Sequence, residues 1–125
     1  MYYIQYAHAR VCSVLRKLAT QGWSWSVESG CNSLDQLSEE AELALMKRLS
    51  AYPDVVNSAA ANFEPHTIAN YLRELAGEFH SYYNSNKVLE DDEALRNARL
   101  ALSVAVRQVI ANGLNLLGVS APEEM

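Results

Sequence analysis

Four side chains near the start of the sequence have the types and the spacing for a chemical role. On a helix over residues 3–21 they would follow one another along a single face: Tyr6, Arg10, Ser13 and Lys17. An exposed aromatic ring can stack on an unpaired base while neighbouring cations contact phosphates. This face therefore indicates contact with RNA. The alternative is that Tyr6 packs on a neighbouring helix or on a further domain.

The other residues that could do chemistry do not form a recognisable centre. They include three histidines and two cysteines: His8, His66, His80, Cys12 and Cys31. The cysteine spacing matches neither a zinc site nor a disulfide framework, and no glycine-rich phosphate loop or nucleophile elbow is present. His66 and His80 would share a helical face about 20 Å apart, too far for a common metal or proton. We therefore expect no active site and no metal, with reduced thiols and with histidines at the surface or at an interface.

Size and composition describe one globular domain. The chain has 125 residues, of which 50% are hydrophobic, enough to bury a core. No apolar run approaches the roughly 18 residues of a membrane span. The first residues, Met1–Gln5, lack the basic and apolar regions of a signal peptide. The sequence thus predicts a cytoplasmic protein without a membrane partner.

The net charge of −5 argues at first against an anionic partner. The distribution is uneven, however, because residues 1–27 and 94–122 carry no acid while the intervening region is strongly acidic. The bases of the two terminal segments are Arg10, Arg16, Lys17, Arg96, Arg99 and Arg107. Because the local field governs an approaching anion, both terminal helices are predicted to be locally positive. The alternative is that these are ordinary solvated residues.

The hydrophobic pattern predicts an all-α fold, a helical bundle of about five helices. The expected helices cover residues 3–21, 38–51, 53–62, 66–84 and 94–118. Gly22 and Gly118 are expected to end the first and last helices. Ser38 is expected to cap the second helix, and Asp91 or Asp92 the last one.

Helical periodicity also predicts which side chains face inward. Three apolar residues lie off the main apolar arc of the last helix, which predicts a central helix between neighbours: Leu100, Val104 and Leu114. In the helix over 38–51 the inward group is Leu43, Leu45, Met46 and Leu49. In the helix over 66–84 the polar side includes His66, Asn70, Arg73 and His80. The serine-rich stretch 22–37 lacks a helical period and is expected to be a long loop, with Trp23 or Trp25 folded over the core.

Several strings are more specific when they are taken together and in order. They are YIQYAHAR at 3–10, PHTIANYL at 65–72, EFHSYYN at 78–84, ARLAL at 98–102, NGLNLLGV at 112–119 and PEEM at 122–125. Together they resemble the C-terminal anticodon-binding domain, or DALR domain, of arginyl-tRNA synthetases over essentially the whole chain. EALR at 93–96 looks like a one-residue variant of the signature for which that domain is named. Related domains occur in cysteinyl- and glycyl-tRNA synthetases, but these strings favour the arginyl type.

The resemblance implies a helical bundle of the class I anticodon-binding type, with a single domain over residues 1–125. It implies that the chain is a fragment of a larger, monomeric arginine–tRNA ligase whose catalytic domain, with its ATP and Mg²⁺, is absent. The fragment itself would be non-catalytic and would hold no cofactor. Its partners would be the tRNA(Arg) anticodon stem-loop and the catalytic domain of the same chain. Its role would be to position tRNA(Arg) for ATP-dependent aminoacylation.

The resemblance also implies which residues contact the anticodon loop. Tyr6 matches an aromatic residue of the first helix, and Tyr83 one near the end of the fourth helix. Lys87 stands where some relatives carry another aromatic residue, so a phosphate contact is expected there. Three further contacts, expected from outward orientation, are Arg10, Asn70 and Arg73. The alternative for His66, Asn70 and Tyr71 is that they hold the domain together.

A second function remains open at this point. The off-arc residues of the last helix and the two tryptophans are also compatible with a non-catalytic helical interaction domain that dimerises through that side.

Overall fold

All regular structure in the chain is helical, as the hydrophobic pattern predicts. The computed structural model describes residues 1–125 and contains no strand. Its elements are α1 (Tyr2–Thr20), α2 (Val27–Cys31), a 3₁₀ turn η1 (Leu34–Gln36), α3 (Glu40–Ser50), α4 (Tyr52–Asn62), α5 (His66–Ser85) and α6 (Glu93–Leu116). None of these helices has the length and hydropathy needed to span a membrane.

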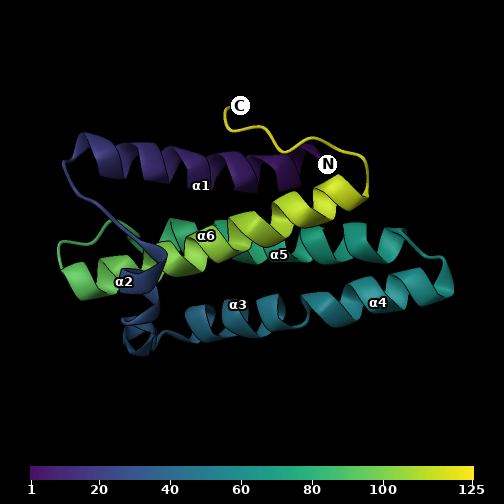
Figure 1. Cartoon of the computed structure of the whole chain (residues 1–125), viewed down its shortest axis with the longest axis horizontal. Helices are drawn as coiled ribbons and strands as arrows, with labels where there is room; N and C mark the ends of the chain where they lie inside the picture. Colours follow the sequence, from purple (N-terminus) through teal and green to yellow (C-terminus); the bar gives the residue numbers. More distant parts are fainter.

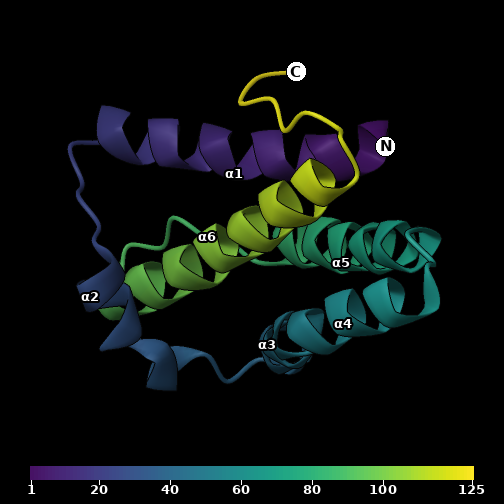
Figure 2. The same cartoon turned by 45° about the vertical axis from the view of Figure 1, so that its right-hand side comes forward.

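The helices form three layers with α6 in the middle (Figure 1). α1 lies along one side, α3 and α4 lie along the other, and α5 and α6 run between them. The turned view shows α6 crossing the bundle obliquely, with α2 beside its first turns (Figure 2). The expectation of a central last helix is therefore confirmed.

The residues that lie off the main arc of α6 are covered by the chain itself. Leu100 and Leu114 are fully buried, and Val104 is half-buried. Leu100 packs in a cluster with Val14 and Leu18 of α1, and both tryptophans pack against that cluster. The apolar side that the dimerisation alternative requires is thus largely covered by the chain's own helices.

The stretch expected to be a long loop contains two short helical elements. α2 is capped by Ser26, whose hydroxyl accepts the Ser29 N–H at 3.1 Å. The Trp25 indole donates to the carbonyl of Asn97 on α6 at 3.0 Å. The tryptophan prediction is confirmed. The loop prediction is wrong in part because α2, five residues long, has too few residues to show a period.

The helix ends agree with the sequence at α6 and differ at α3. Asp92 caps α6 by accepting the Ala94 N–H at 3.1 Å, and Gly118 follows the helix with a φ of 73°. Ser38 does not cap α3. The cap is Glu39, one residue later, whose N–H donates to Glu42 Oε1 at 3.0 Å.

The inward group predicted for α3 is only partly confirmed. Leu45 is buried and Leu49 is half-buried, whereas Leu43 and Met46 are exposed. α3 packs on α5 and α6, and its apolar side chains that face away from these two helices remain exposed.

Gly30 lets α2 approach α6 closely, which gives a first testable prediction. A Cβ there would lie 2.7 Å from the Ala101 Cβ and 3.1 Å from the Asn97 carbonyl oxygen. Gly30→Ala is therefore expected to lower the free energy of unfolding by about 1–3 kcal/mol, as overpacking does elsewhere. Urea denaturation followed by circular dichroism measures the change.

Gly77→Ala in α5 is the matched control for this prediction. A Cβ at Gly77 would meet nothing closer than 3.6 Å, so helix propensity alone predicts a gain of up to about 1 kcal/mol. Equal effects of the two substitutions would contradict the close approach of α2 to α6.

Candidate nucleic-acid interface

A hollow of about 510 Å³ lies between α1, the end of α5 and the C-terminal tail. We call it the α1 groove. Its lining residues are Tyr6, Ala9, Arg10, Ser13, Arg16, Lys17, Tyr83, Glu124 and Met125. The four side chains singled out from the spacing on the first helix all line it. The prediction that they share one face is therefore confirmed.

Arg10 joins the two tyrosines that come from different helices. Its Cζ lies 4.9 Å from the centroid of the Tyr6 ring and 4.3 Å from that of the Tyr83 ring. Its Nη2 also donates to the Tyr6 hydroxyl at 3.3 Å. The Tyr6 side of this unit is open, since Tyr6 is 40% exposed and Tyr83 is half-buried. The arrangement combines aromatic surface with a positive charge held against it.

The cations of the α1 groove are not neutralised by ion pairs. Arg10, Arg16 and Lys17 have no carboxylate within ion-pair distance, although Glu124 also lines the groove. Arg16 instead donates to the Glu123 carbonyl at 3.3 Å. The locally positive character predicted for the first helix is therefore present at the groove.

His80 lies beneath the α1 groove rather than on a polar surface. It is 7% exposed, and its ring stacks on Tyr6 with centroids 5.3 Å apart. Arg10 Nη1 donates to His80 Nδ1 at 3.0 Å, and His80 Nε2 donates to the Tyr3 carbonyl at 3.3 Å. The prediction that His80 belongs to the polar side of its helix is wrong because α1 covers that part of α5. Burial, with the nearby Arg10 charge, lowers the pKa of His80 below its ordinary value, and the Tyr3 carbonyl partly opposes the shift.

The C-terminal tail forms one wall of the α1 groove. Figures 1 and 2 show it lying back over α1. Three side chains of α1 bind its backbone: Gln5 Nε2 donates to the Ser120 carbonyl at 2.9 Å, His8 Nδ1 to Pro122 at 2.9 Å, and Arg16 to Glu123. Sequence reasoning missed this wall. The signal available was the line of polar side chains on α1 at helical spacing, Gln5, His8 and Arg16.

Lys87 adjoins the α1 groove, as its predicted role requires. A smaller hollow of about 330 Å³ is lined by Lys87 and Trp23 and shares Lys17 and Tyr83 with the groove. Lys87 is exposed and forms no ion pair. An extended chain could therefore pass from the groove to Lys87 along one surface.

Asn70 and Arg73 lie elsewhere on α5. Arg73 Nη1 donates to Asn70 Oδ1 at 2.9 Å, and Asn70 lines a separate hollow of about 660 Å³ between α3, α4 and α5. Along the helix these two residues lie about 20 and 15 Å from Tyr83. The structure does not bring them together with Tyr6, since outward orientation does not say which side of the bundle a residue faces.

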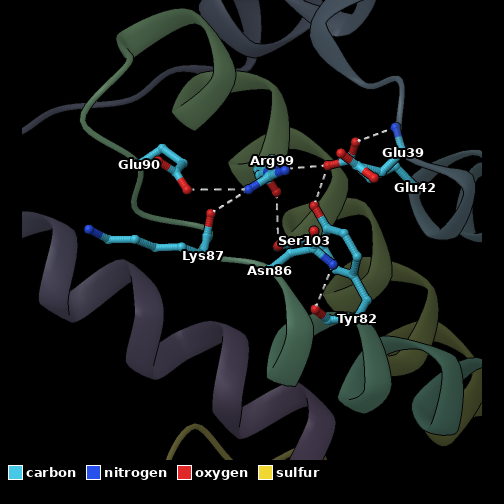
Figure 3. A network of polar contacts seen from close by, with 8 residues as sticks. All are labelled: Glu39, Glu42, Tyr82, Asn86, Lys87, Glu90, Arg99 and Ser103. Carbon is cyan, nitrogen blue, oxygen red and sulfur yellow. Dashed lines mark hydrogen bonds and ion pairs between the residues drawn. The ribbon is translucent and has the colours of Figure 1, made fainter.

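The arginines at the start of α6 are buried, which corrects the charge prediction for the last helix. Arg96 and Arg99 are 6% and 7% exposed. Arg99 Nε pairs with Glu42 Oε2 at 2.9 Å, and its Nη1 donates to the Lys87 carbonyl at 2.8 Å, as Figure 3 shows. Arg96 Nη1 donates to the carbonyls of Glu90 at 2.9 Å and Asp91 at 3.2 Å. These charges hold the connection between α5 and α6 and are not available to an anionic partner.

The same network joins α3 and α5 to that connection. The Tyr82 hydroxyl donates to Glu42 Oε2, and Glu90 Oε1 lies 3.6 Å from Arg99 Nη1. Burial and the bond to Glu42 raise the pKa of Tyr82, which therefore stays a neutral donor. In Figure 3 the Lys87 side chain points away from this network while its carbonyl points into it. The network thus fixes the backbone that carries Lys87.

Comparison with known proteins identifies the family of this fold. The family model described as DALR anticodon binding domain matches residues 4–125. Proteins named arginine–tRNA ligase from Thioalkalivibrio sulfidiphilus and Legionella pneumophila (strain Corby) are 56% and 54% identical over 125 residues, which is 100% of this chain and 21% of each relative. The chain thus spans about a fifth of the length of the curated relatives it matches.

Two solved structures agree with this assignment. The arginyl-tRNA synthetase of Thermus thermophilus superposes with a TM-score of 0.82 at 36% identity, over 98% of this chain and 21% of that one. A putative arginyl-tRNA synthetase of Campylobacter jejuni gives 0.79 at 28% identity, over 99% and 26%. The chain belongs to the family of DALR anticodon-binding domains, and the relatives it matches within that family are arginine–tRNA ligases.

Proposed function

We propose that this chain is the anticodon-binding module of an arginine–tRNA ligase and that it binds the anticodon stem-loop of tRNA(Arg) in the α1 groove. The observation that carries this proposal is the Arg10 guanidinium held against both Tyr6 and Tyr83. Unpaired loop bases can stack on aromatic rings and on the guanidinium plane, which is how proteins recognise single-stranded RNA. The family to which the chain belongs supports the same function.

We assign different contacts with the RNA to the different residues of the α1 groove. Tyr6 and Tyr83 supply the faces for splayed bases, with Arg10 between the two helices. Lys17 lines both hollows and Lys87 lines the smaller one, in each case together with Tyr83, and we assign these two lysines to phosphates next to a stacked base. Asn70 and Arg73 line neither of these two hollows.

At the level of the whole protein, the proposed role is to position tRNA(Arg). Residues 1–125 would form one anticodon-binding domain, and a catalytic domain in the remainder of a monomeric, cytoplasmic parent would carry ATP and Mg²⁺ and perform the aminoacylation. Holding the anticodon loop at one end fixes where the acceptor end can reach, so that the bound tRNA presents its terminus to the reacting groups. The chain itself would hold no cofactor.

The salt dependence of RNA binding should report the number of phosphate contacts. RNA hairpins with an arginine anticodon and with an unrelated anticodon are titrated with the protein at several salt concentrations. We expect tighter binding of the arginine hairpin and a linear fall of log K with log salt. Lys17→Ala should weaken binding and reduce the slope by about 0.7, the value for one phosphate contact on a single strand.

Lys47→Ala is the control, because Lys47 is an exposed lysine of α3 beside the hollow that contains Asn70. It should leave both affinity and slope unchanged. Negligible binding of both hairpins, or equal effects of the two lysine substitutions, would contradict the proposed function.

A further inference from the structure

We propose that His80 is a positioning residue of the α1 groove: its neutral ring fixes the Arg10 guanidinium in place against Tyr6 and Tyr83. The inference rests on the proposed function, because it assigns His80 a share in RNA binding through Arg10. His80 itself is too deeply buried to touch a ligand in the groove.

Both nitrogens of the His80 ring are fixed by α1. Nδ1 accepts from Arg10 Nη1 at 3.0 Å, and Nε2 donates to the Tyr3 carbonyl at 3.3 Å. Because a guanidinium can only donate, Nδ1 must be unprotonated, and the ring is therefore the neutral Nε2–H tautomer. The ring also packs against Tyr3 and Tyr6, with centroids 4.7 and 5.3 Å away. One buried ring on α5 thus sets the position of three residues of α1.

A neutral acceptor does something here that a carboxylate could not do. An acid at this position would orient Arg10 equally well but would also cancel the charge that an RNA phosphate or base needs. The imidazole orients the guanidinium and leaves its charge intact. An arginine side chain loses considerable rotamer freedom when it is fixed. Because His80 already fixes Arg10 in the free protein, the Arg10 side chain loses little further rotamer entropy when RNA binds.

His80 can hold Arg10 only while its ring is neutral, so the positioning role should depend on pH. The titratable or charged groups that contact the ring are Arg10, Tyr3 and Tyr6 on α1, and its packed neighbour on α5 is the apolar Phe79. Protonation would remove the acceptor from Nδ1 and place a second positive charge against Arg10. Because burial lowers the pKa of His80, the neutral form persists in the folded protein below the ordinary value of 6.5. The stability contributed by the neutral ring is present above that pH and is lost as the pH falls towards the lowered pKa.

The test compares two substitutions of similar size. His80→Asn can place an amide oxygen near the position of Nδ1, whereas His80→Leu offers no acceptor. At a temperature where circular dichroism shows each variant folded, His80→Leu should bind the arginine-anticodon hairpin about tenfold more weakly, the effect of one hydrogen bond to a charged group. His80→Asn should recover most of that loss. In an Arg10→Ala background His80→Leu should have no further effect, because the residue acts through Arg10.

A second measurement needs no RNA. ¹⁵N relaxation of the Arg10 side chain should show restricted motion in the wild type and in His80→Asn, and free motion in His80→Leu. Acidification below the lowered pKa of His80 should release Arg10 in the wild type but not in His80→Asn. Equal Arg10 mobility in all three proteins would overturn the inference.

The two measurements separate the inference from the function on which it rests. If the wild type binds the hairpin and Arg10→Ala weakens it, but His80→Leu binds as the wild type does, then the positioning role is wrong and the function stands. If the wild type binds no RNA, the proposed function is wrong, and the relaxation measurement alone decides whether His80 holds Arg10.

Discussion

Arg99→Ala is expected to lower the free energy of unfolding by about 3–5 kcal/mol, the usual effect of removing one partner of a buried ion pair. Glu42 has no exposed surface, and Arg99 Nε is its only cationic partner, at 2.9 Å. Without Arg99, the Glu42 carboxylate would remain buried, and the Tyr82 hydroxyl would be the only hydrogen-bond partner of its Oε2 atom. Urea denaturation followed by circular dichroism measures the loss.

The charge pair can be separated from the simple loss of packing. Replacing both partners together, Glu42→Leu with Arg99→Met, should recover part of the stability, because no buried charge remains, although the Tyr82 hydroxyl and the Glu39 N–H lose their acceptor. Arg73→Ala is the control for an exposed arginine and should change stability by no more than about 0.5 kcal/mol. A loss for Arg99→Ala that is no larger than for Arg73→Ala would contradict the buried network.

The same substitution should also affect RNA binding through the connection between α5 and α6. Arg99 Nη1 binds the Lys87 carbonyl, so its removal frees the backbone that carries the Lys87 side chain. RNA binding by the folded Arg99→Ala protein is therefore expected to depend less steeply on salt concentration, because one phosphate contact is lost. Figure 3 shows how the network meets this segment from the side opposite to the Lys87 side chain.

Tyr83→Ala is expected to weaken binding of the arginine-anticodon hairpin by about 1–3 kcal/mol, which corresponds to roughly 5- to 150-fold. The substitution removes a base-stacking surface and one of the two rings that hold Arg10. Tyr6→Ala is expected to fall in the same range, since its ring is exposed and faces the same groove. Fluorescence anisotropy of a labelled hairpin measures both.

Two controls decide whether the rings themselves matter. Tyr83→Phe keeps the ring and should bind nearly as the wild type does. Tyr2→Ala removes a tyrosine of the same helix as Tyr6 that is 72% exposed and lies outside the groove, so binding should not change. If Tyr2→Ala and Tyr6→Ala weakened binding equally, stacking in the α1 groove would be excluded.

The sequence predicted the long helices well because each carries a clear apolar stripe. α1, α5 and α6 are close to their predicted bounds, and Asp92 caps α6 as expected. α2 was not predicted because it has too few residues to show a helical period. Its place in the fold depends on the tertiary contact of Gly30 with α6, which no local pattern reveals.

The candidate site was predictable where it depends on one helix and not where it depends on two. The shared face of Tyr6 and Arg10 follows from spacing on α1 alone. Periodicity marked His80 as polar and therefore as outward-facing, but α1 covers it. A polar residue can be buried whenever another helix supplies its hydrogen-bond partners, and that partner lies far away in the sequence.

The charge prediction for the last helix was wrong for the same reason: its arginines find their partners in other parts of the chain. The two terminal helices looked alike as acid-free basic segments, yet Arg96 and Arg99 of α6 are buried and bonded within the chain. The cations of α1 remain free of carboxylates and line the groove. What an anionic partner encounters is therefore set by which charges are paired in the fold, not by net charge.

The most direct test of the α1 groove is residue-resolved NMR of the ¹⁵N-labelled protein during titration with the arginine-anticodon hairpin. We expect the largest chemical-shift changes at Tyr6, Arg10 and Tyr83, with smaller changes at Lys17 and Lys87. Changes concentrated instead around Asn70 and Arg73, with the groove residues unmoved, would contradict binding in the α1 groove.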